Sequence, residues 1–172
     1  MGTGARRDAP DAPADDLLLA RRGRAFVARV LNDLTDEQLD APSAVPGQSR
    51  RYVIAHLCQQ ARAQALALKT LRAPLSADDL RSRIDVARAV TLPPHALRYL
   101  FQHAGIHLDV EWRDLPQGQW NRLVSMPEYC GPARNLPRRH AAALWQAASD
   151  LNTNAQVPEL PAGLFPPPHG TR

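Results

Sequence analysis

The segment from Pro46 to Leu57 constrains the fold of this chain most, because it combines a turn, a helix start and a histidine within that helix. Its opening Pro-Gly pair interrupts regular structure. Ser49 is a good N-cap, since its hydroxyl can accept a hydrogen bond from an unpaired amide of the first turn. The apolar residues that follow recur at helical spacing, and His56 falls at the edge of their stripe. We therefore expect a helix over residues 49–71 that holds His56 at the interior of a helical assembly or at its mouth.

Three further stretches share this helical periodicity. Val27, Val30 and Leu31 belong to an apolar stripe that predicts a helix over residues 15–33. Prolines open the other two, from about residue 93 to 115 and from 137 to 151, where proline is tolerated in the first turn. Four amphipathic helices with a long connection between the second and third predict an all-α fold, a four-helix bundle with long crossover connections.

The segments between these helices are shorter and less regular. We expect a capped turn at residues 35–39, a short helix over 77–88, a short extended piece at 119–126 and a loop over 127–137. The predicted domain organisation is a flexible N-terminal tail at 1–14, one bundle domain at 15–164 and a proline-rich flexible tail at 165–172.

Composition narrows the classes of function. The chain has 172 residues, enough for one domain with a real core, and a net charge of +4. Its cations are nearly all arginine and are scattered, while aromatic residues make up only 5%. Nucleic-acid binding favours a clustered basic surface with interleaved aromatics, so we expect no nucleic-acid partner.

Cysteine content and hydropathy indicate the compartment. Cys58 and Cys130 do not make a disulfide framework, which favours two reduced thiols. No apolar run approaches the roughly 20 residues of a membrane span. The first 14 residues are polar and of mixed charge, without the apolar core of a signal peptide. We therefore expect a cytoplasmic protein with no membrane association.

An ordered set of short motifs resembles one protein family. The motifs are Leu34-Thr35-Asp36-Glu37-Gln38-Leu39, Pro42-Ser43, Pro46-Gly47, Val53-Ile54-Ala55-His56-Leu57, Leu115-Pro116 with Trp120, Leu136-Pro137, Trp145 with Asp150-Leu151, and Glu159-Leu160-Pro161. Together they resemble the metal-binding domain of mycothiol-dependent maleylpyruvate isomerases, within the DinB/YfiT-like superfamily of four-helix bundles. The likeness covers residues 17–164 and implies a DinB-like bundle.

The resemblance also implies a metal site that this sequence does not reproduce. Family members hold a divalent metal with the histidine that matches His56, plus a glutamate and a histidine one turn apart on the fourth helix. Residues four apart share one helix face, so such a pair can converge with a third ligand. Here Ala143 and Ala147 stand at the two fourth-helix positions. One imidazole alone does not hold zinc usefully, so the family's metal site is predicted to be degenerate.

Relocated ligands are the alternative. His140 precedes Ala143 by three residues on the same helix, and His103 and His107 are spaced for chelation on the third helix. A metal site rebuilt from His56, His140 and either His103 or His107 therefore stays open. In the opposing interpretation His56 is a satisfied, half-buried histidine and the others lie at the surface.

The candidate site residues follow from these patterns. His56 is the predicted general acid–base, since imidazole titrates near neutral pH, and His140 is a helper. Arginine pairs at residues 50–51 and 138–139 form a cationic rim suited to a carboxylate if those helix ends meet, or are solvated if they do not. The predicted substrate-binding residues are Tyr52, Gln60, Arg51, Arg139 and Trp145.

Two classes of function remain. The first is an enzyme of isomerase, cyclase or lyase type, using a bundle cavity at His56 on a small molecule such as a carboxylate or polyketide-like compound. The alternatives are a metal-dependent thiol S-transferase with relocated histidine ligands, and a non-catalytic ligand-binding bundle. We expect no bound cofactor, with a divalent metal (zinc or nickel) or a low-molecular-weight thiol as the alternative, and a homodimer is compatible with the superfamily.

Overall fold

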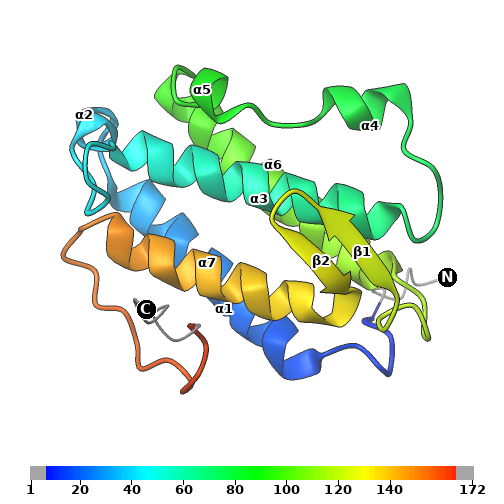
Figure 1. Ribbon diagram of the computed structural model, residues 1–172. Coiled ribbons are helices and arrows are strands. Elements are labelled where there is room, and N and C mark those ends of the chain that lie inside the picture. Colours follow the sequence, from blue (N-terminus) through cyan, green and yellow to red (C-terminus); the bar gives the residue numbers. More distant parts are fainter. Residues whose placement is uncertain (1–6, 166–172) are drawn as a thin grey trace, which may run out of the picture.

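The computed structural model describes residues 7–165, which are mostly helical and carry one small two-stranded sheet (Figure 1). The four long helices are α1, α3, α6 and α7. The elements in chain order are α1 (Ala14–Asp33), α2 (Asp36–Asp40), α3 (Arg50–Lys69), α4 (Ala77–Arg81), α5 (Val86–Ala89), α6 (Pro94–Asp114), β1 (Leu123–Met126), β2 (Tyr129–Pro132), the 3₁₀ turn η1 (Ala133–Asn135) and α7 (Leu136–Asp150).

The long helices pack as two parallel pairs. α1 and α7 run side by side in the same direction, with Arg138 at the start of α7 3.2 Å from Asp16 at the start of α1 (Figure 1). α3 and α6 form the second parallel pair, in which Arg62 meets His103 at 3.2 Å. The two pairs run in opposite directions, so α3 is antiparallel to α7 and the apolar core lies between the pairs.

A glycine sets the distance between α1 and α7. An added Cβ at Gly23 would lie 3.1 Å from the Leu144 Cβ and 3.1 Å from the Trp145 Nε1. The Trp145 indole lies against this point and donates to the Leu19 carbonyl at 3.3 Å. The helices approach this closely because residue 23 has no side chain.

The sequence signals for helix starts are confirmed. Ser49 is the N-cap of α3, with its hydroxyl accepting from the Tyr52 amide at 3.4 Å. Thr35 and Gln38 form a capping box at α2. Proline occupies the first turn of both α6 and α7, where its missing N–H costs no helix hydrogen bond.

Two parts of the predicted secondary structure need correction. The fold is not purely helical, because β1 pairs antiparallel with β2, with Ser125 opposite Cys130. β1 lies inside the predicted extended piece, whereas β2 lies where a loop is predicted. The helix predicted over 77–88 divides into α4 and α5, because Asp85 accepts from the Ala87 amide and starts a new helix.

The predicted N-terminal tail is also partly wrong. Asp8 accepts two hydrogen bonds from the Arg21 guanidinium, at 2.7 and 2.8 Å, and Asp11 accepts one from the Gly118 amide at 2.8 Å. Asp8 therefore docks the chain before α1 onto α1 itself, and Asp11 docks it onto the loop after α6. Residues 1–6 and 166–172, which the sequence assigns to tails, lie outside the described residues.

Arg50 joins three elements at one end of the molecule. Its guanidinium donates to the carbonyls of Leu151 (2.7 Å), Asn152 (2.8 Å) and Gln38 (3.0 Å). The carbonyls at a helix C-terminus have no partner within the helix, and a cation there also interacts favourably with the helix dipole. Arg50 therefore fixes the register of α3 against α7.

Replacing Arg50 tests this role. Arg50→Met removes the three donated hydrogen bonds and leaves carbonyls unpaired, so we expect the free energy of unfolding to fall by about 1–3 kcal/mol. Chemical denaturation measures the loss, and Arg22→Met, at an exposed arginine of α1, is the matched control with a small effect. Equal stability of the two variants would contradict the assignment.

Candidate functional site

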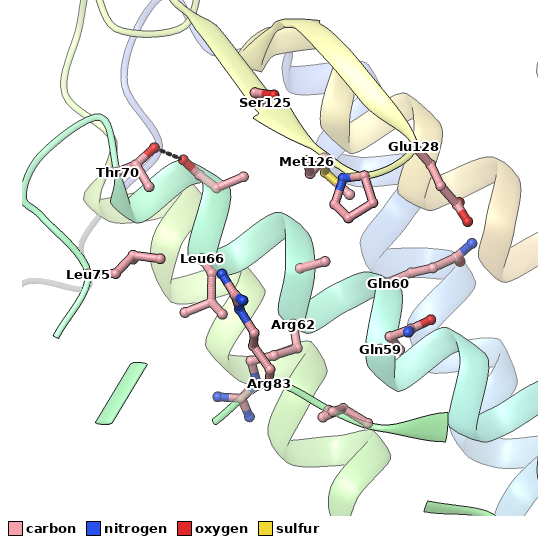
Figure 2. A pocket seen from close by; sticks show the side chains of 14 residues that line it. Gln59, Gln60, Arg62, Leu66, Thr70, Leu75, Arg83, Ser125, Met126 and Glu128 are labelled. Carbon is pink, nitrogen blue, oxygen red and sulfur yellow. Dashed lines mark hydrogen bonds between the residues drawn. The ribbon is translucent and has the colours of Figure 1, made fainter. Parts of the chain in front are cut away.

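The larger cavity lies over the outer side of α3, where the hairpin β1–β2 and the connection from α4 to α5 cover it (Figure 2). Its volume is about 310 Å³. This is close to the lower limit for pockets that enclose a small ligand. The lining residues come from three segments: Gln59, Gln60, Arg62, Ala63, Leu66, Ala67 and Thr70 of α3 and its C-cap, Leu75, Arg83 and Ile84 of the α4 and α5 connections, and Ser125, Met126, Pro127 and Glu128 of the hairpin.

Small side chains on α3 make room for the hairpin. Ala63 and Ala67 lie one turn apart on the face that the hairpin covers, so no bulky side chain fills the space above them. Behind the hairpin tip, the Arg139 guanidinium lies 4.6 Å from the centre of the Tyr129 ring and donates to the Glu128 carbonyl at 3.3 Å. Tyr129 in turn donates its hydroxyl to the Pro132 carbonyl at 2.8 Å.

Two arginines line this cavity, and the sequence analysis missed both. Arg62 is 8% exposed, and its Nη2 lies 3.2 Å from the Nδ1 of His103. Burial lowers the pKa of Arg62, because a low-dielectric surrounding disfavours the charged form. Arg83 lies beside it in Figure 2 and is exposed. Arg62 could have been noticed in the sequence, because it is an arginine within the alanine-rich stretch of α3.

His56 lies beside this cavity rather than in it. The imidazole is half-buried and stacks on the Tyr52 ring, with ring centroids 5.9 Å apart and planes 10° apart. Helical spacing places it on the same face of α3 as Gln60, one turn nearer the N-terminus. Gln60 is therefore the predicted substrate-binding residue that the structure places in the lining, while Tyr52 packs against His56.

The antiparallel register places His56 and the two alanines at the same level along α3 and α7. Arg50 of α3 contacts Leu151 just after α7. Moving the same number of residues inward along both helices brings His56 level with the stretch that holds Ala143 and Ala147. These two positions present only methyl groups, and Ala147 is 4% exposed.

His140 belongs to a different environment. It is buried, lies edge-on to the Trp112 ring with centroids 5.9 Å apart, and lines a small internal cavity of about 10 Å³ with Leu57 and Cys58. Burial and then the nearby charge of Arg24 lower the pKa of His140 to about 4, so its imidazole is neutral at pH 7. Leu57 and Cys58 lie on another face of α3 than His56 does, so the structure does not bring the predicted catalytic pair together.

The remaining histidines are engaged elsewhere. His103 pairs with Arg62, and the His107 Nε2 lies 3.4 Å from the Glu111 carboxylate. Within residues 7–165, no group of three or more His, Cys, Asp or Glu side chains is placed to hold a metal ion. The residues present therefore do not fit the three-ligand metal site that the family resemblance implies, and the relocated site stays a prediction.

The two arginine pairs do not meet, so they form no cationic rim. Because α3 and α7 are antiparallel, residues 50–51 and 138–139 lie at opposite ends of the helices. Arg51 forms an ion pair with Asp40 and donates to the Leu92 carbonyl at 2.7 Å, and Arg139 stacks on Tyr129.

Trp145 is an anchor of the core, not a residue of the cavity. Its side chain is buried, with the ring centroid 5.3 Å from that of Phe26. Its indole N–H is already donated to the Leu19 carbonyl. The indole therefore packs α7 against α1.

The sequence pattern of the mycothiol maleylpyruvate isomerase N-terminal domain matches residues 20–152. The chain belongs to this family. The solved structures agree: the mycothiol-dependent maleylpyruvate isomerase is 27% identical with a TM-score of 0.72, and its histidine-to-alanine variant is 26% identical with a TM-score of 0.73. Each match covers 83% of this chain and 61% of the isomerase, so the chain spans about three-fifths of the length of those proteins.

A comparison with curated proteins found no match. Among the described helices, none combines the length and the apolar character that crossing a membrane requires.

The buried His140 predicts a pH-dependent stability. Its pKa of about 4 in the folded chain lies below the value near 6.5 of an unfolded histidine. The unfolded state therefore binds the extra proton as pH falls from about 6.5 to 4, and over that window the free energy of unfolding drops by on the order of 3 kcal/mol.

Urea denaturation of the chain and of His140→Leu between pH 7.5 and 4.5 measures this dependence. We expect the variant to lose much less stability on acidification, because it has no buried imidazole to protonate on unfolding. His95→Leu, at an exposed histidine, is the matched control. An unchanged pH slope in His140→Leu would contradict the assignment.

Proposed function

We propose that this chain is a small-molecule-processing member of its family, an isomerase-type enzyme that acts on a small organic acid without the family's metal. The observation that carries the proposal is that Ala143 and Ala147 offer only methyl groups on the part of α7 that the helix register brings level with His56. We propose that α1, α3, α6 and α7 form a DinB-like four-helix bundle and that this pair is its degenerate metal site.

The side chains around His56 support chemistry without a metal. Its half-buried imidazole has a stacking partner in Tyr52 and lies one turn from Gln60, which lines the larger cavity. A histidine can remove and return protons at neutral pH, which makes it the commonest general acid–base in enzymes.

His56 has one defined role in this proposal. It takes a proton from one carbon of the bound acid and returns it to another, so that the substrate is rearranged and no atom is gained or lost. Gln60 positions the substrate through its amide, which can both donate and accept hydrogen bonds. The same acid–base step serves a cyclase or a lyase, so the proposal covers that group of reactions.

Two alternatives have less support. A thiol S-transferase with relocated histidines needs a ligand cluster, and residues 7–165 contain none. A ligand-binding protein without catalysis is supported by the cavity of about 310 Å³ itself, whose lining does not include His56. Turnover distinguishes this last alternative from the enzyme.

A direct assay tests the enzyme proposal. The substrate is maleylpyruvate, the acid named for the similar isomerases, and its loss is followed with and without mycothiol after metal has been removed by a chelator. We expect slow turnover that survives chelation and falls by about 10²-fold or more in His56→Gln, the usual scale of a general acid–base contribution.

His95→Gln controls for the loss of a histidine elsewhere, since His95 is exposed at the start of α6. Turnover that needs added zinc would contradict the metal-free mechanism. Equal rates in His56→Gln and the unmodified chain would exclude His56 as the general acid–base. The absence of turnover on this or related acids would favour the ligand-binding alternative.

Restoring the ligands tests the degenerate metal site. If Ala143 and Ala147 occupy ligand positions, Ala143→Glu with Ala147→His should bind one zinc ion per chain, whereas the unmodified chain should retain less than about one-tenth of an equivalent after dialysis. Zinc titration followed by elemental analysis measures both. Adding His56→Ala to the double variant should abolish binding, and circular dichroism reports whether each variant is folded. A folded double variant that binds no zinc would contradict the proposed site.

A further inference from the structure

Arg62 is a buried cation without a carboxylate partner. Its side chain is 8% exposed, and its Nε has no hydrogen-bond partner among the described residues. The neighbour that it does have is the Nδ1 of His103, at 3.2 Å, which can accept from a guanidinium only as a neutral imidazole. A buried charge is costly unless it is paired, so this arrangement lacks an anion.

Several arginines of the described residues have the carboxylate partner that Arg62 lacks. Arg21 binds Asp8 and Asp109, Arg72 binds Glu111, and Arg98 binds Asp36. All of these arginines are more exposed than Arg62, yet each has a carboxylate. Arg62 is the most buried of these four arginines, and it is the one that has no carboxylate partner among the described residues.

The cavity beside Arg62 has a polar end and an apolar body. Arg83, a second guanidinium without a carboxylate partner among residues 7–165, lines the same space. The apolar part of the cavity wall comes from Leu66, Ile84 and Met126. The carboxylate of the lining, Glu128, points toward Gln60 at the other end, away from the two arginines (Figure 2).

We infer that the cavity binds an amphipathic carboxylate, with its carboxylate held by Arg62 and Arg83 and its apolar body between α3 and the hairpin. The planar guanidinium fork matches a carboxylate with two parallel hydrogen bonds, which a halide or a neutral amide cannot make. The far end of such a ligand reaches Gln60, one turn from His56. This inference rests on the proposed function, because it names the class of acid on which His56 would act.

Titration with octanoate and with octanamide tests the inference. The two probes share an apolar chain and differ in the charged group. The ¹⁵N-labelled chain reports on the arginine Nε–H signals, and calorimetry gives the affinities. The Nε–H signal of Arg62 is assigned as the one that disappears in Arg62→Met, and we expect octanoate to shift it. We expect octanamide to bind at least about tenfold more weakly than octanoate, because it cannot form the charge-assisted pair.

Variants separate binding from folding. Arg62→Met should lower the affinity for octanoate by at least about tenfold. It should not lower the melting temperature, because an apolar side chain of similar length replaces a buried unpaired charge. Arg83→Gln should weaken octanoate less, because Arg83 is exposed. Arg88→Gln removes one positive charge from α5, outside the lining, and should leave the affinity unchanged.

Each result decides the inference. Equal binding of octanoate and octanamide, or no octanoate binding at millimolar concentration, would overturn it, as would a lowered melting temperature in Arg62→Met with octanoate affinity retained. Octanoate binding that depends on Arg62, together with no turnover in the maleylpyruvate assay, would sustain the carboxylate site while the enzyme proposal fails.

Discussion

The hydrogen bond from Arg50 to the Leu151 carbonyl fixes the relation on which the site depends. It sets the antiparallel register of α3 and α7, and that register decides which residues of the two helices meet. His56 therefore lies level with Ala143 and Ala147 along the helix axes, and the arginine pairs at the two helix starts lie at opposite ends of the two helices. One contact at the edge of the core thus determines what the interface between α3 and α7 can hold.

The sequence predicts the helices well, because their signals are local. Ser49 caps α3, prolines open α6 and α7, and an apolar stripe at helical spacing marks each long helix. β2 lacks such a signal, since its Pro- and Gly-containing segment becomes a strand only by pairing with β1. Asp8 and Asp11 likewise owe their places to partners far along the chain.

The site was harder to predict than the fold. His56 and the two alanines were singled out as ligand positions only through the family resemblance, which predicts them there. Sequence motifs could not identify Arg62 and Arg83, because the cavity that joins the two exists only once α3, the α4–α5 connection and the hairpin have come together. The opposite error occurred for His140 and Trp145, which were predicted as site residues. Their residue types are common in active sites, but in this structure both side chains pack in the core.

The turn of the hairpin gives the cavity one of its walls, while Val124 of β1 is buried in the core. The hairpin tip, with Met126 and Glu128, covers the space over α3, while the Tyr129 ring, next to Gly131, and the Arg139 guanidinium support it from behind. Pro127 and Glu128 at the turn are exposed, so substitutions at these two positions should cost little stability. Substitutions in this short turn can therefore alter which ligand the cavity prefers while the four long helices keep their positions.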